Sequence, residues 1–495
     1  MKIKRDYLCK LDKYYADFWI KVVRKVKLIH FTFYFFKMNI LDKIKYFLKK
    51  NIITILLVLV LVLAFGIRIN NIFQYNTWWA DDGGAHIEYI EHILDYGSLP
   101  SMSDNYLAWH EPLYYIFQAV WTKLGLVLGI SSDNIINWQE FLGLILFGFF
   151  IFLVHKNSMI FTQNRWLALL NVFVFSILFS SVKLSAYVNN EFPVQILIIL
   201  LVWLFFRLKL LENLKNRQVI YWSVLLGLSM LIKLTAFLVL LSVILLWFLF
   251  AVVNKKKYVL VYILLSIMVV SVINLPWLAY KKINFDSALT INIYEQNNKQ
   301  KILTSDAWDY IFKGNNSIFV DQPFWVYEKY SFFPILLADI FTDYYNLFNH
   351  VDEIKSLPEG SKIMIDNGQF STPFLILSGL WSVRVGLVIS LICLIGFFAS
   401  IYKTLLEKRI DWQKLFLYTL IFGGLLALIY NNLRFPYPER GVLKVSFIFY
   451  ILPLISVVSY GWWWQVLQEK KWLLFAVLFL PWVIYFVMAS PILFV

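Results

Sequence analysis

The chain has 495 residues, of which 60% are hydrophobic, 19% aromatic and 15% charged. This apolar fraction exceeds what the core of a soluble domain needs, so the composition predicts an all-α polytopic membrane protein. The formal net charge of the chain is +14, and the lysines and arginines lie in short segments between apolar runs. They form no single basic face with interleaved aromatic residues, which argues against a nucleic-acid partner. Two cysteines, Cys9 and Cys393, cannot supply a disulfide framework.

The N-terminal segment, residues 1–51, is rich in lysine and arginine and is predicted to be a cytoplasmic arm that contacts membrane lipid. The first apolar span follows at 52–69 and, by the positive-inside rule, runs outward. The next segment, 70–137, should therefore be extracytoplasmic. It contains one lysine, Lys123, against eight acidic residues: Asp81, Asp82, Glu88, Glu91, Asp95, Asp104, Glu111 and Asp133.

The apolar run 114–129 is interpreted as an in-plane or re-entrant helix, because counting it as a span would reverse the sidedness of every later loop. The run 219–253 is too long for one crossing and has basic residues at both ends, so it predicts two short helices joined at Lys233. The other predicted spans are 138–155, 166–187, 192–206, 259–275, 384–402, 413–430, 442–462 and 472–489. The total is about 11 transmembrane helices, with a range of about 9–13.

These elements predict four parts. After the arm comes a transmembrane core, 52–275, which carries the acidic outer loop 70–137. The polar stretch 276–373 is rich in aromatic residues, which argues against disorder, and is predicted to be a partly helical extracytoplasmic subdomain. The last helices occupy 374–495. The predicted location is the plasma membrane, with the N-terminus in the cytoplasm.

The outer loop holds the densest set of ionisable groups. Asp81 and Asp82 precede Gly83-Gly84-Ala85-His86 and Glu88, and the turn His110-Glu111-Pro112 follows. This arrangement resembles the first extracytoplasmic loop of the GT-C superfamily, the polytopic glycosyltransferases that use polyprenyl-phosphate sugars and include protein O-mannosyltransferases and lipid A aminoarabinose transferases. The chain departs from the family pattern at Gly83, where a second carboxylate often stands, and at Glu111, which replaces a proline.

The resemblance implies an inverting transfer of a hexosyl or pentosyl group from a polyprenyl-phosphate donor to a glycan, lipid or protein acceptor. Such a transfer needs a base for the acceptor hydroxyl proton. The family spacing favours Asp82 as this base, with Asp81 as the second candidate. The alternative is that either aspartate only caps the helix that begins near Ala85.

Further polar residues of the outer loops are candidate acceptor- or sugar-binding groups. They are His86, Glu88, His110 and Glu111, together with Asn190 and Glu191 at an outward helix-to-helix turn. Asp82, His86 and Glu111 are also possible ligands of a divalent cation. Ordinary hydrogen bonds and satisfied helix ends are the alternative explanation of the same residues.

Several cations break the positive-inside pattern, and a phosphate-bearing donor would need positive charge at that surface. The candidates are Lys233, Arg384, Arg434, Arg440 and Lys444. Contacts of single lysine or arginine side chains with lipid headgroups are the alternative.

Two other classes of function remain. A transporter or flippase of lipid-linked saccharides would place ionisable groups near the middle of the bilayer. A structural membrane scaffold would leave the acidic loop and the outward cations without a role. The position of the carboxylates in the first outer loop favours the glycosyltransferase.

Overall fold

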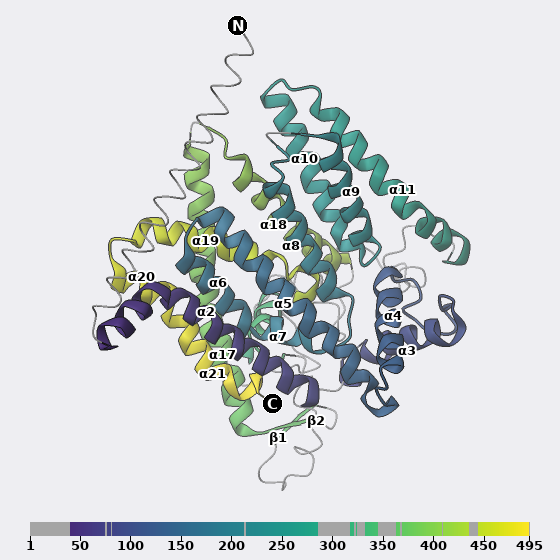
Figure 1. The fold of residues 1–495 in the computed structure, drawn as a ribbon, viewed down its shortest axis with the longest axis horizontal. Helices are drawn as coiled ribbons and strands as arrows, with labels where there is room; N and C mark the ends of the chain where they lie inside the picture. The colour runs from purple at the N-terminus through teal and green to yellow at the C-terminus, as the bar shows by residue number, and fades with distance from the viewer. Residues whose placement is uncertain are drawn as a thin grey trace. The chain divides into compact units, whose positions relative to one another are not determined.

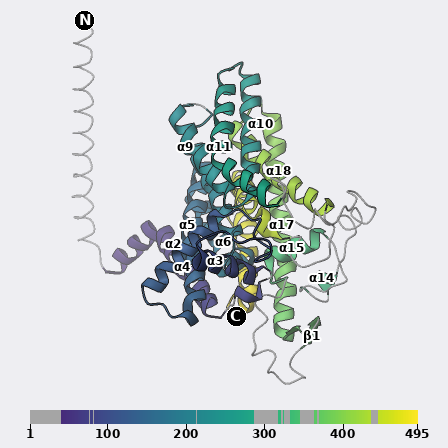
Figure 2. The same cartoon turned by 90° about the vertical axis from the view of Figure 1, so that its right-hand side faces the viewer.

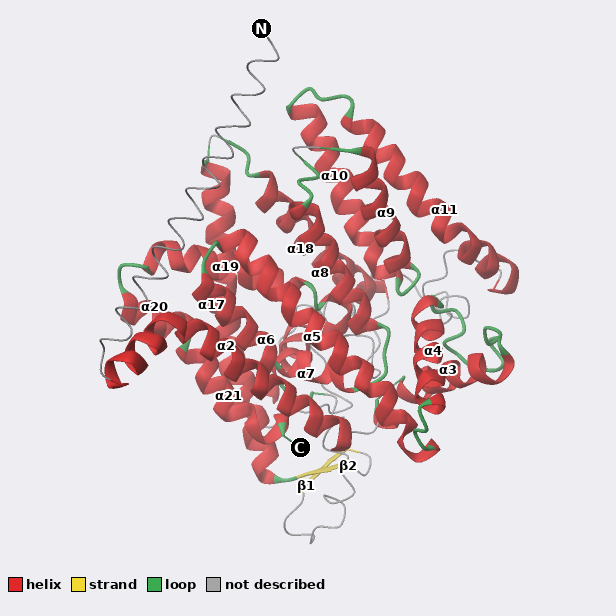
Figure 3. Cartoon of the chain, in the orientation of Figure 1, coloured by secondary structure: helices red, strands yellow, loops and turns green. Residues whose placement is uncertain are grey.

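The structure is a computed structural model that describes most of the apolar segments and part of the polar stretch between them. The described residues are 40–74, 77–80, 82–211, 214–285, 317–320, 323, 332–344, 363–366, 369–407, 409–434 and 444–494. Their regular structure is helical apart from one two-stranded sheet (Figure 3). The all-α polytopic fold predicted from composition is therefore confirmed for this part of the chain.

The chain divides into two compact units, Met1–Leu59 and Val60–Val495. The described part of the first unit is the beginning of helix α2 (Ile40–Gln74), which continues in the second unit. This helix starts inside the segment predicted to be the basic arm, 1–51, whose first 39 residues lie outside the described residues. The predicted division into four parts stays a prediction.

The second unit holds the remaining elements (Figure 1). Its first half contains η1 (Thr77–Trp79), α3 (Gly83–Tyr96), α4 (Leu113–Val127), η2 (Ser132–Asn134), α5 (Ile135–Thr162), α6 (Arg165–Ile177), α7 (Phe179–Ala186), α8 (Glu191–Arg207), α9 (Asn216–Met230), η3 (Leu234–Ala236), α10 (Phe237–Val253) and α11 (Val259–Phe285). Its second half contains α14 (Ser317–Val320), α15 (Phe332–Phe341), β1 (Ile363–Asp366), β2 (Gln369–Ser371), α17 (Pro373–Leu406), α18 (Trp412–Arg434), η5 (Val445–Ile448), α19 (Ile451–Leu467), α20 (Lys471–Leu478) and α21 (Leu480–Leu493).

Seven helical stretches of the described chain are long and apolar enough to cross a membrane, or up to eight if the bent pair α6 and α7 forms one span. This count is below the predicted 11. The predicted spans at 192–206 and 442–462 correspond to α8 and α19, which have 17 residues each, and the first of the two short helices predicted over 219–253 corresponds to α9, which has 15. A helix of 17 residues rises about 25 Å, less than the roughly 30 Å hydrocarbon core. Length therefore separates these helices from the seven, among which η3 and α10 count as one stretch of 20 residues, Leu234–Val253.

One local prediction about helices is confirmed, and a second is confirmed in part. The run 219–253 forms α9 and α10, and Lys233 lies in the connection between them. Helices α9, α10 and α11 then pack side by side (Figure 1). The run 114–129 forms the separate helix α4, whose 15 residues are too few to span a bilayer, and its in-plane or re-entrant placement stays a prediction. Helices α3 and α4 pack against each other in both views (Figure 2).

Helix α11 continues through Pro276, where the predicted outer subdomain begins, to Phe285. A proline removes one backbone hydrogen bond, which an apolar helix tolerates when neighbouring groups satisfy the freed carbonyl. The described parts of this stretch are α14, α15 and the antiparallel pair of β1 and β2.

A buried arginine donates hydrogen bonds to backbone carbonyl groups at the break between α6 and α7. These two helices meet at an angle of 58°. The fully buried Arg68 of α2 donates to the carbonyl oxygen of Ser176 at 2.9 Å. It also donates to the hydroxyl oxygens of Ser181 and Ser185, at 3.0 and 2.9 Å. The end of a helix leaves carbonyl groups without partners, and Arg68 supplies donors for them. The bend sets the direction of α7, which leads into the turn before α8.

Candidate functional site

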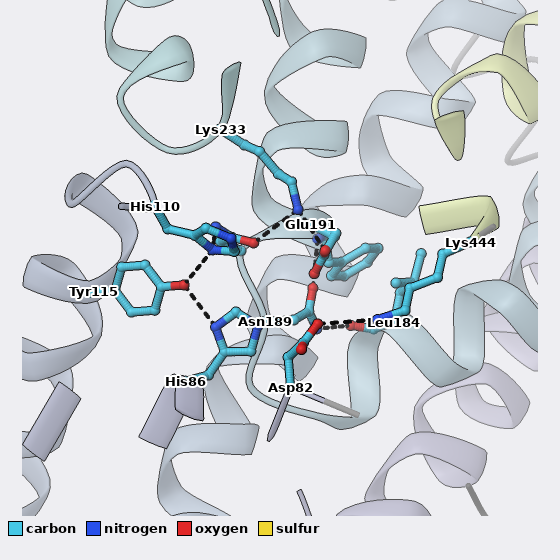
Figure 4. A network of polar contacts seen from close by, with 11 residues as sticks. Asp82, His86, His110, Tyr115, Leu184, Asn189, Glu191, Lys233 and Lys444 are labelled. Atoms are coloured by element: carbon cyan, nitrogen blue, oxygen red, sulfur yellow. Dashed lines mark hydrogen bonds and ion pairs between the residues drawn. The ribbon is translucent and has the colours of Figure 1, made fainter. Parts of the chain in front are cut away.

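Polar side chains from five segments meet at one place (Figure 4). The segments are the start of α3, the loop before α4 with the first turn of that helix, the N-terminus of α8, the connection after α9 and the residue before η5. We call this set the polar network. Its members are Asp82, His86, His110, Tyr115, Asn190, Glu191, Lys233 and Lys444. Seven of these eight residues were candidates in the sequence, and the eighth, Tyr115, is discussed below.

Two glycines fix the entry into α3. A Cβ atom at Gly83 would lie 1.7 Å from the carbonyl oxygen of Thr77, and one at Gly84 would lie 2.8 Å from the ring of Trp78. A larger residue at Gly83 would clash with backbone, so this position cannot hold the second carboxylate of the family pattern without a shift of the chain. The close approach sets where Asp82, the preceding residue, enters the site.

Asp82 has two partners. Its Oδ1 accepts a hydrogen bond from the hydroxyl of Tyr106 at 2.9 Å, and its Oδ2 lies 3.2 Å from Nζ of Lys444. Although Asp82 occupies the N-cap position of α3, its side chain makes no capping hydrogen bond within the described chain. The charge of Lys444 holds the pKa of Asp82 well below its usual range, against the opposing effect of burial. The carboxylate is therefore ionised and directed into the network.

Glu191 and Lys233 form a second ion pair. Nζ of Lys233 lies 2.6 Å from Oε1 of Glu191 and also donates to Oδ1 of Asn190 at 3.3 Å. The ring of Phe447 lies 5.1 Å from the same Nζ, within the range of a cation–π contact. A backbone hydrogen bond from Leu113 to the carbonyl of Leu231, at 3.0 Å, ties the start of α4 to the end of α9. This bond brings the loop of His110 close to Lys233.

Tyr115 joins the two histidines of the network. Its buried hydroxyl lies 2.8 Å from Nδ1 of His86 and 3.1 Å from Nδ1 of His110. A hydroxyl carries one proton, so Tyr115 donates to one ring and accepts from the other. Nδ2 of Asn190 lies 3.4 Å from Nδ1 of His110 and can only donate, which favours an unprotonated Nδ1 in His110. Nδ1 of His86 is then the protonated one.

Both imidazoles are neutral. Burial lowers the pKa of His86 to about 4, against the raising effect of the Glu191 and Asp82 charges. Burial also lowers the pKa of His110 well below its usual value, and the charge of Lys233 adds to this effect. The His86 ring lies between Tyr115 and Asp82 (Figure 4). The network thus places the neutral His86 ring beside the ionised Asp82 carboxylate.

Two acidic candidates have partners elsewhere. Oε1 of Glu111 lies 3.2 Å from Nζ of Lys281 on α11, and both side chains are buried. The aromatic rings of Trp109 and Trp277 lie 5.9 and 5.5 Å from that ammonium. Oε2 of Glu88 accepts a long hydrogen bond of 3.4 Å from Nδ2 of Asn105. The departure from the family pattern at Glu111 is therefore matched by a buried lysine.

The proposed cation ligands do not gather in the structure. Asp82 and His86 belong to the polar network, whereas Glu111 is paired with Lys281. Within the described ranges, no three His, Cys, Asp or Glu side chains are placed to hold a metal ion. Asp81, which precedes the site, lies outside these ranges. A divalent cation stays a prediction.

The cationic candidates separate into two groups. Lys233 and Lys444 both lie in the network. Arg384 on α17 instead donates to the carbonyl oxygen of Phe319 at 2.7 Å and lies over the Trp381 ring, so its contacts are with α14 and its own helix. Arg440 and the side chain of Arg434 lie outside the described residues.

Sequence reasoning missed the tyrosines of the site. Tyr106 is the partner of Asp82, and Tyr115 is the partner of both histidines. Tyr115 follows His110 by five residues and begins an apolar helix, so its sequence context resembles that of any core tyrosine. The tyrosine hydroxyl could have indicated a polar neighbour, because a buried tyrosine hydroxyl usually has a hydrogen-bond partner.

Solved structures resemble this fold. The apo crystal structure of the oligosaccharyltransferase of Archaeoglobus fulgidus matches with a TM-score of 0.50 and 14% identity, over 89% of this chain and 56% of that one. The chain therefore shares its fold with this oligosaccharyltransferase. The same enzyme tethered to an acceptor peptide with an NVT sequon gives a TM-score of 0.51 and 12% identity, over 90% of this chain and 56% of that one.

The likeness is one of fold. This chain spans a little over half the length of the oligosaccharyltransferase that it matches, 56% in both structures. No protein-family model and no curated protein match the sequence. The fold expected from the loop motif is thus confirmed by this likeness, and the reaction has to be argued from the polar network.

Proposed function

We propose that the protein is a membrane glycosyltransferase that moves a sugar from a polyprenyl-phosphate donor to an acceptor at the extracytoplasmic face. The observation that carries the proposal is the meeting of Asp82 with Lys444 and of Glu191 with Lys233 in one network. Two carboxylates supply proton acceptance and two ammonium groups supply charge for a phosphate. The GT-C fold supports the same assignment, because it is the fold of a known oligosaccharyltransferase.

In the proposed step, the acceptor oxygen attacks the anomeric carbon from the side opposite the phosphate. The bond from that carbon to the acceptor oxygen forms while the bond to the phosphate oxygen breaks, which inverts the configuration. Asp82 takes the acceptor proton as general base. The products are the glycosylated acceptor and the polyprenyl phosphate, whose negative charge Lys233 and Lys444 would bind.

The ion pairs have a second consequence for donor binding. A phosphate that approaches Lys444 competes with Asp82 for the same ammonium group, which lies 3.2 Å from the carboxylate. Loss of that contact would raise the pKa of Asp82, because Lys444 is the main cause of its depression. Donor binding would then make Asp82 a stronger base at the moment when the acceptor proton has to leave.

The acceptor class stays open among a glycan, a lipid and a protein. A peptide acceptor has the support of fold likeness, since one of the matched structures holds an acceptor peptide. The hydrogen-bonding side chains of the network could contact a hydroxyl or an amide of any of these three acceptor classes. His86, His110 and Asn190 are the proposed sugar- or acceptor-binding residues.

The test uses the full-length protein in detergent with a radiolabelled polyprenyl-phosphate sugar and mixed candidate acceptors. We expect release of polyprenyl phosphate with label on an acceptor or, without one, slow hydrolysis of the donor. The transporter alternative is tested in proteoliposomes, where a flippase would move the labelled lipid across the bilayer without cleaving it. Movement of intact donor with no cleavage would overturn the proposal.

A further inference from the structure

A buried ion pair contacts Val445, the residue that directly follows Lys444 of the polar network. Asp339 of α15 contacts Nζ of Lys183 of α7 through its Oδ1, and the two side chains are 0% and 5% exposed. Buried charges are costly unless they are paired and hydrogen-bonded, so such a pair has to be matched by specific contacts. Lys183 lies on the short helix after the bend that Arg68 stabilises.

The second carboxylate oxygen of Asp339 has a different partner. Oδ2 accepts a hydrogen bond from the backbone N–H of Val445 at 2.7 Å. Val445 is the first residue of η5, where backbone donors lack partners within the helix. Lys444 directly precedes it, and its side chain reaches Oδ2 of Asp82. Asp339 thus connects α7 to the backbone that carries Lys444.

Helix η5 and the residue before it each contact a residue of the polar network. Lys444 contacts Asp82 at 3.2 Å, and Phe447 lies 5.1 Å from Nζ of Lys233. A displacement of η5 would therefore move one ammonium group and alter the surroundings of the other. Asp339 is the described side chain whose carboxylate fixes the N-terminal end of η5.

We propose that Asp339 is a positioning residue, which holds Lys444 in the site by accepting the Val445 N–H while Lys183 neutralises its charge. This inference rests on the proposed function, in which Lys444 binds the donor phosphate. The competing explanation is that the Lys183–Asp339 pair only stabilises the packing of α7 against α15.

Removing one partner alone would leave a buried unpaired charge, so the test uses two double variants that both lack the ion pair. Lys183→Met with Asp339→Asn keeps a side-chain oxygen for Val445, and Lys183→Met with Asp339→Leu does not. Positioning predicts that donor KM rises roughly tenfold in the Leu variant relative to the Asn variant, the size expected for a weakened charge-assisted contact. Equal KM values with unequal thermal stability would overturn it.

The effect has to pass through Lys444. In a Lys444→Met background, the Asn and Leu double variants should show the same donor KM, because the group being positioned is gone. Additive effects would assign Asp339 to some other contact of η5.

A readout without turnover separates this inference from the proposed function. Cysteines replace Asp82 and Lys444 in a chain lacking Cys9 and Cys393, and a short bifunctional methanethiosulfonate crosslinks them. We expect the crosslinking yield to fall in the Leu double variant and to persist in the Asn double variant. A yield that is the same in both would contradict positioning even if the chain that keeps Asp82 and Lys444 transfers sugar. A difference in yield would support positioning, and absence of transferase activity in the chain that keeps Asp82 and Lys444 would then contradict only the proposed function.

Discussion

Nζ of Lys444 lies 3.2 Å from Oδ2 of Asp82, although 362 positions separate the two residues in the chain. The contact joins the residue before α3 to the segment before α19. It also explains why the carboxylate is ionised in a partly buried place, since the lysine charge outweighs burial. In the proposed reaction Asp82 takes the proton of the acceptor and Lys444 binds the phosphate of the donor.

The contact predicts the pH dependence of turnover. With Lys444 present, the pKa of Asp82 lies well below its usual range, so the base stays deprotonated as the pH falls through mildly acidic values. In Lys444→Met the main lowering cause is gone and burial raises the pKa. The acid limb of the kcat/KM profile should therefore move to higher pH in the variant.

The matched control is Lys403→Met, which removes an equal charge from the end of α17, where Lys403 donates to Gln465 at 3.0 Å. This variant should keep the wild-type profile. An acid limb at the same pH in all three proteins would mean that Lys444 does not control the basicity of Asp82.

The histidines predict a pH dependence of stability. The folded state holds the pKa of His86 at about 4, below the roughly 6.5 of an unfolded histidine, so the unfolded state binds the proton first. Stability is complete above pH 6.5 and falls as the pH drops toward 4. The shift corresponds to about 3 kcal/mol as an order of magnitude.

The measurement is the thermal unfolding midpoint in detergent between pH 8 and pH 4. His86→Gln should show a smaller decrease on acidification than the wild-type protein, because one buried titrating group is gone. His110→Gln should act in the same direction, since burial also lowers the pKa of His110. Parallel curves for the wild type and both variants would show that the two rings carry no linked proton.

Lys233 can be separated from its partner Glu191 by charge-balanced variants. Lys233→Met leaves Glu191 buried without its ion pair, whereas Lys233→Met with Glu191→Gln removes both charges. If Lys233 binds the donor phosphate, both variants should lose about 10- to 100-fold in kcat/KM for the donor. Recovery of donor use in the double variant would mean that Lys233 serves only to neutralise Glu191.

Much of the architecture was predictable because long apolar runs and their basic flanks follow directly from the physics of the bilayer. The helices on either side of Lys233 and the separate helix α4 are confirmed. The sequence could not reveal that α8, α9 and α19 are too short to count with the seven longer stretches. Exact helix ends depend on tertiary contacts, such as the hydrogen bonds that Arg68 donates to residues on both sides of the break between α6 and α7.

The site was predictable in its residue types and only partly in its pairings. Of the acids and cations selected in the sequence, Lys233 and Lys444 lie beside Glu191 and Asp82, and their roles stay predictions. Which cation joins which acid depends on the three-dimensional packing of distant segments. The partner of Glu111, Lys281, stands in a helix that the sequence presents as an ordinary apolar span.

The sidedness predicted from charge stays a prediction and has a direct test. Ser103 is exposed in the loop between α3 and α4, and Lys257 is exposed between α10 and α11. In a chain lacking Cys9 and Cys393, an impermeant thiol reagent applied to intact cells should label Ser103→Cys and spare Lys257→Cys. Permeabilisation should expose the second position. The reverse pattern would invert the topology.

The central claim is that Asp82 is the base of the transfer reaction. In the described structure its side chain does not cap α3, so loss of a cap cannot account for a loss of turnover in Asp82→Asn. The decisive measurement is the rate of sugar transfer by Asp82→Asn under saturating donor, with Asp81→Asn measured beside it. The account predicts a fall of about 10²- to 10⁴-fold for Asp82→Asn with nearly unchanged donor binding. Wild-type turnover in Asp82→Asn, or a severe loss confined to Asp81→Asn, would contradict it.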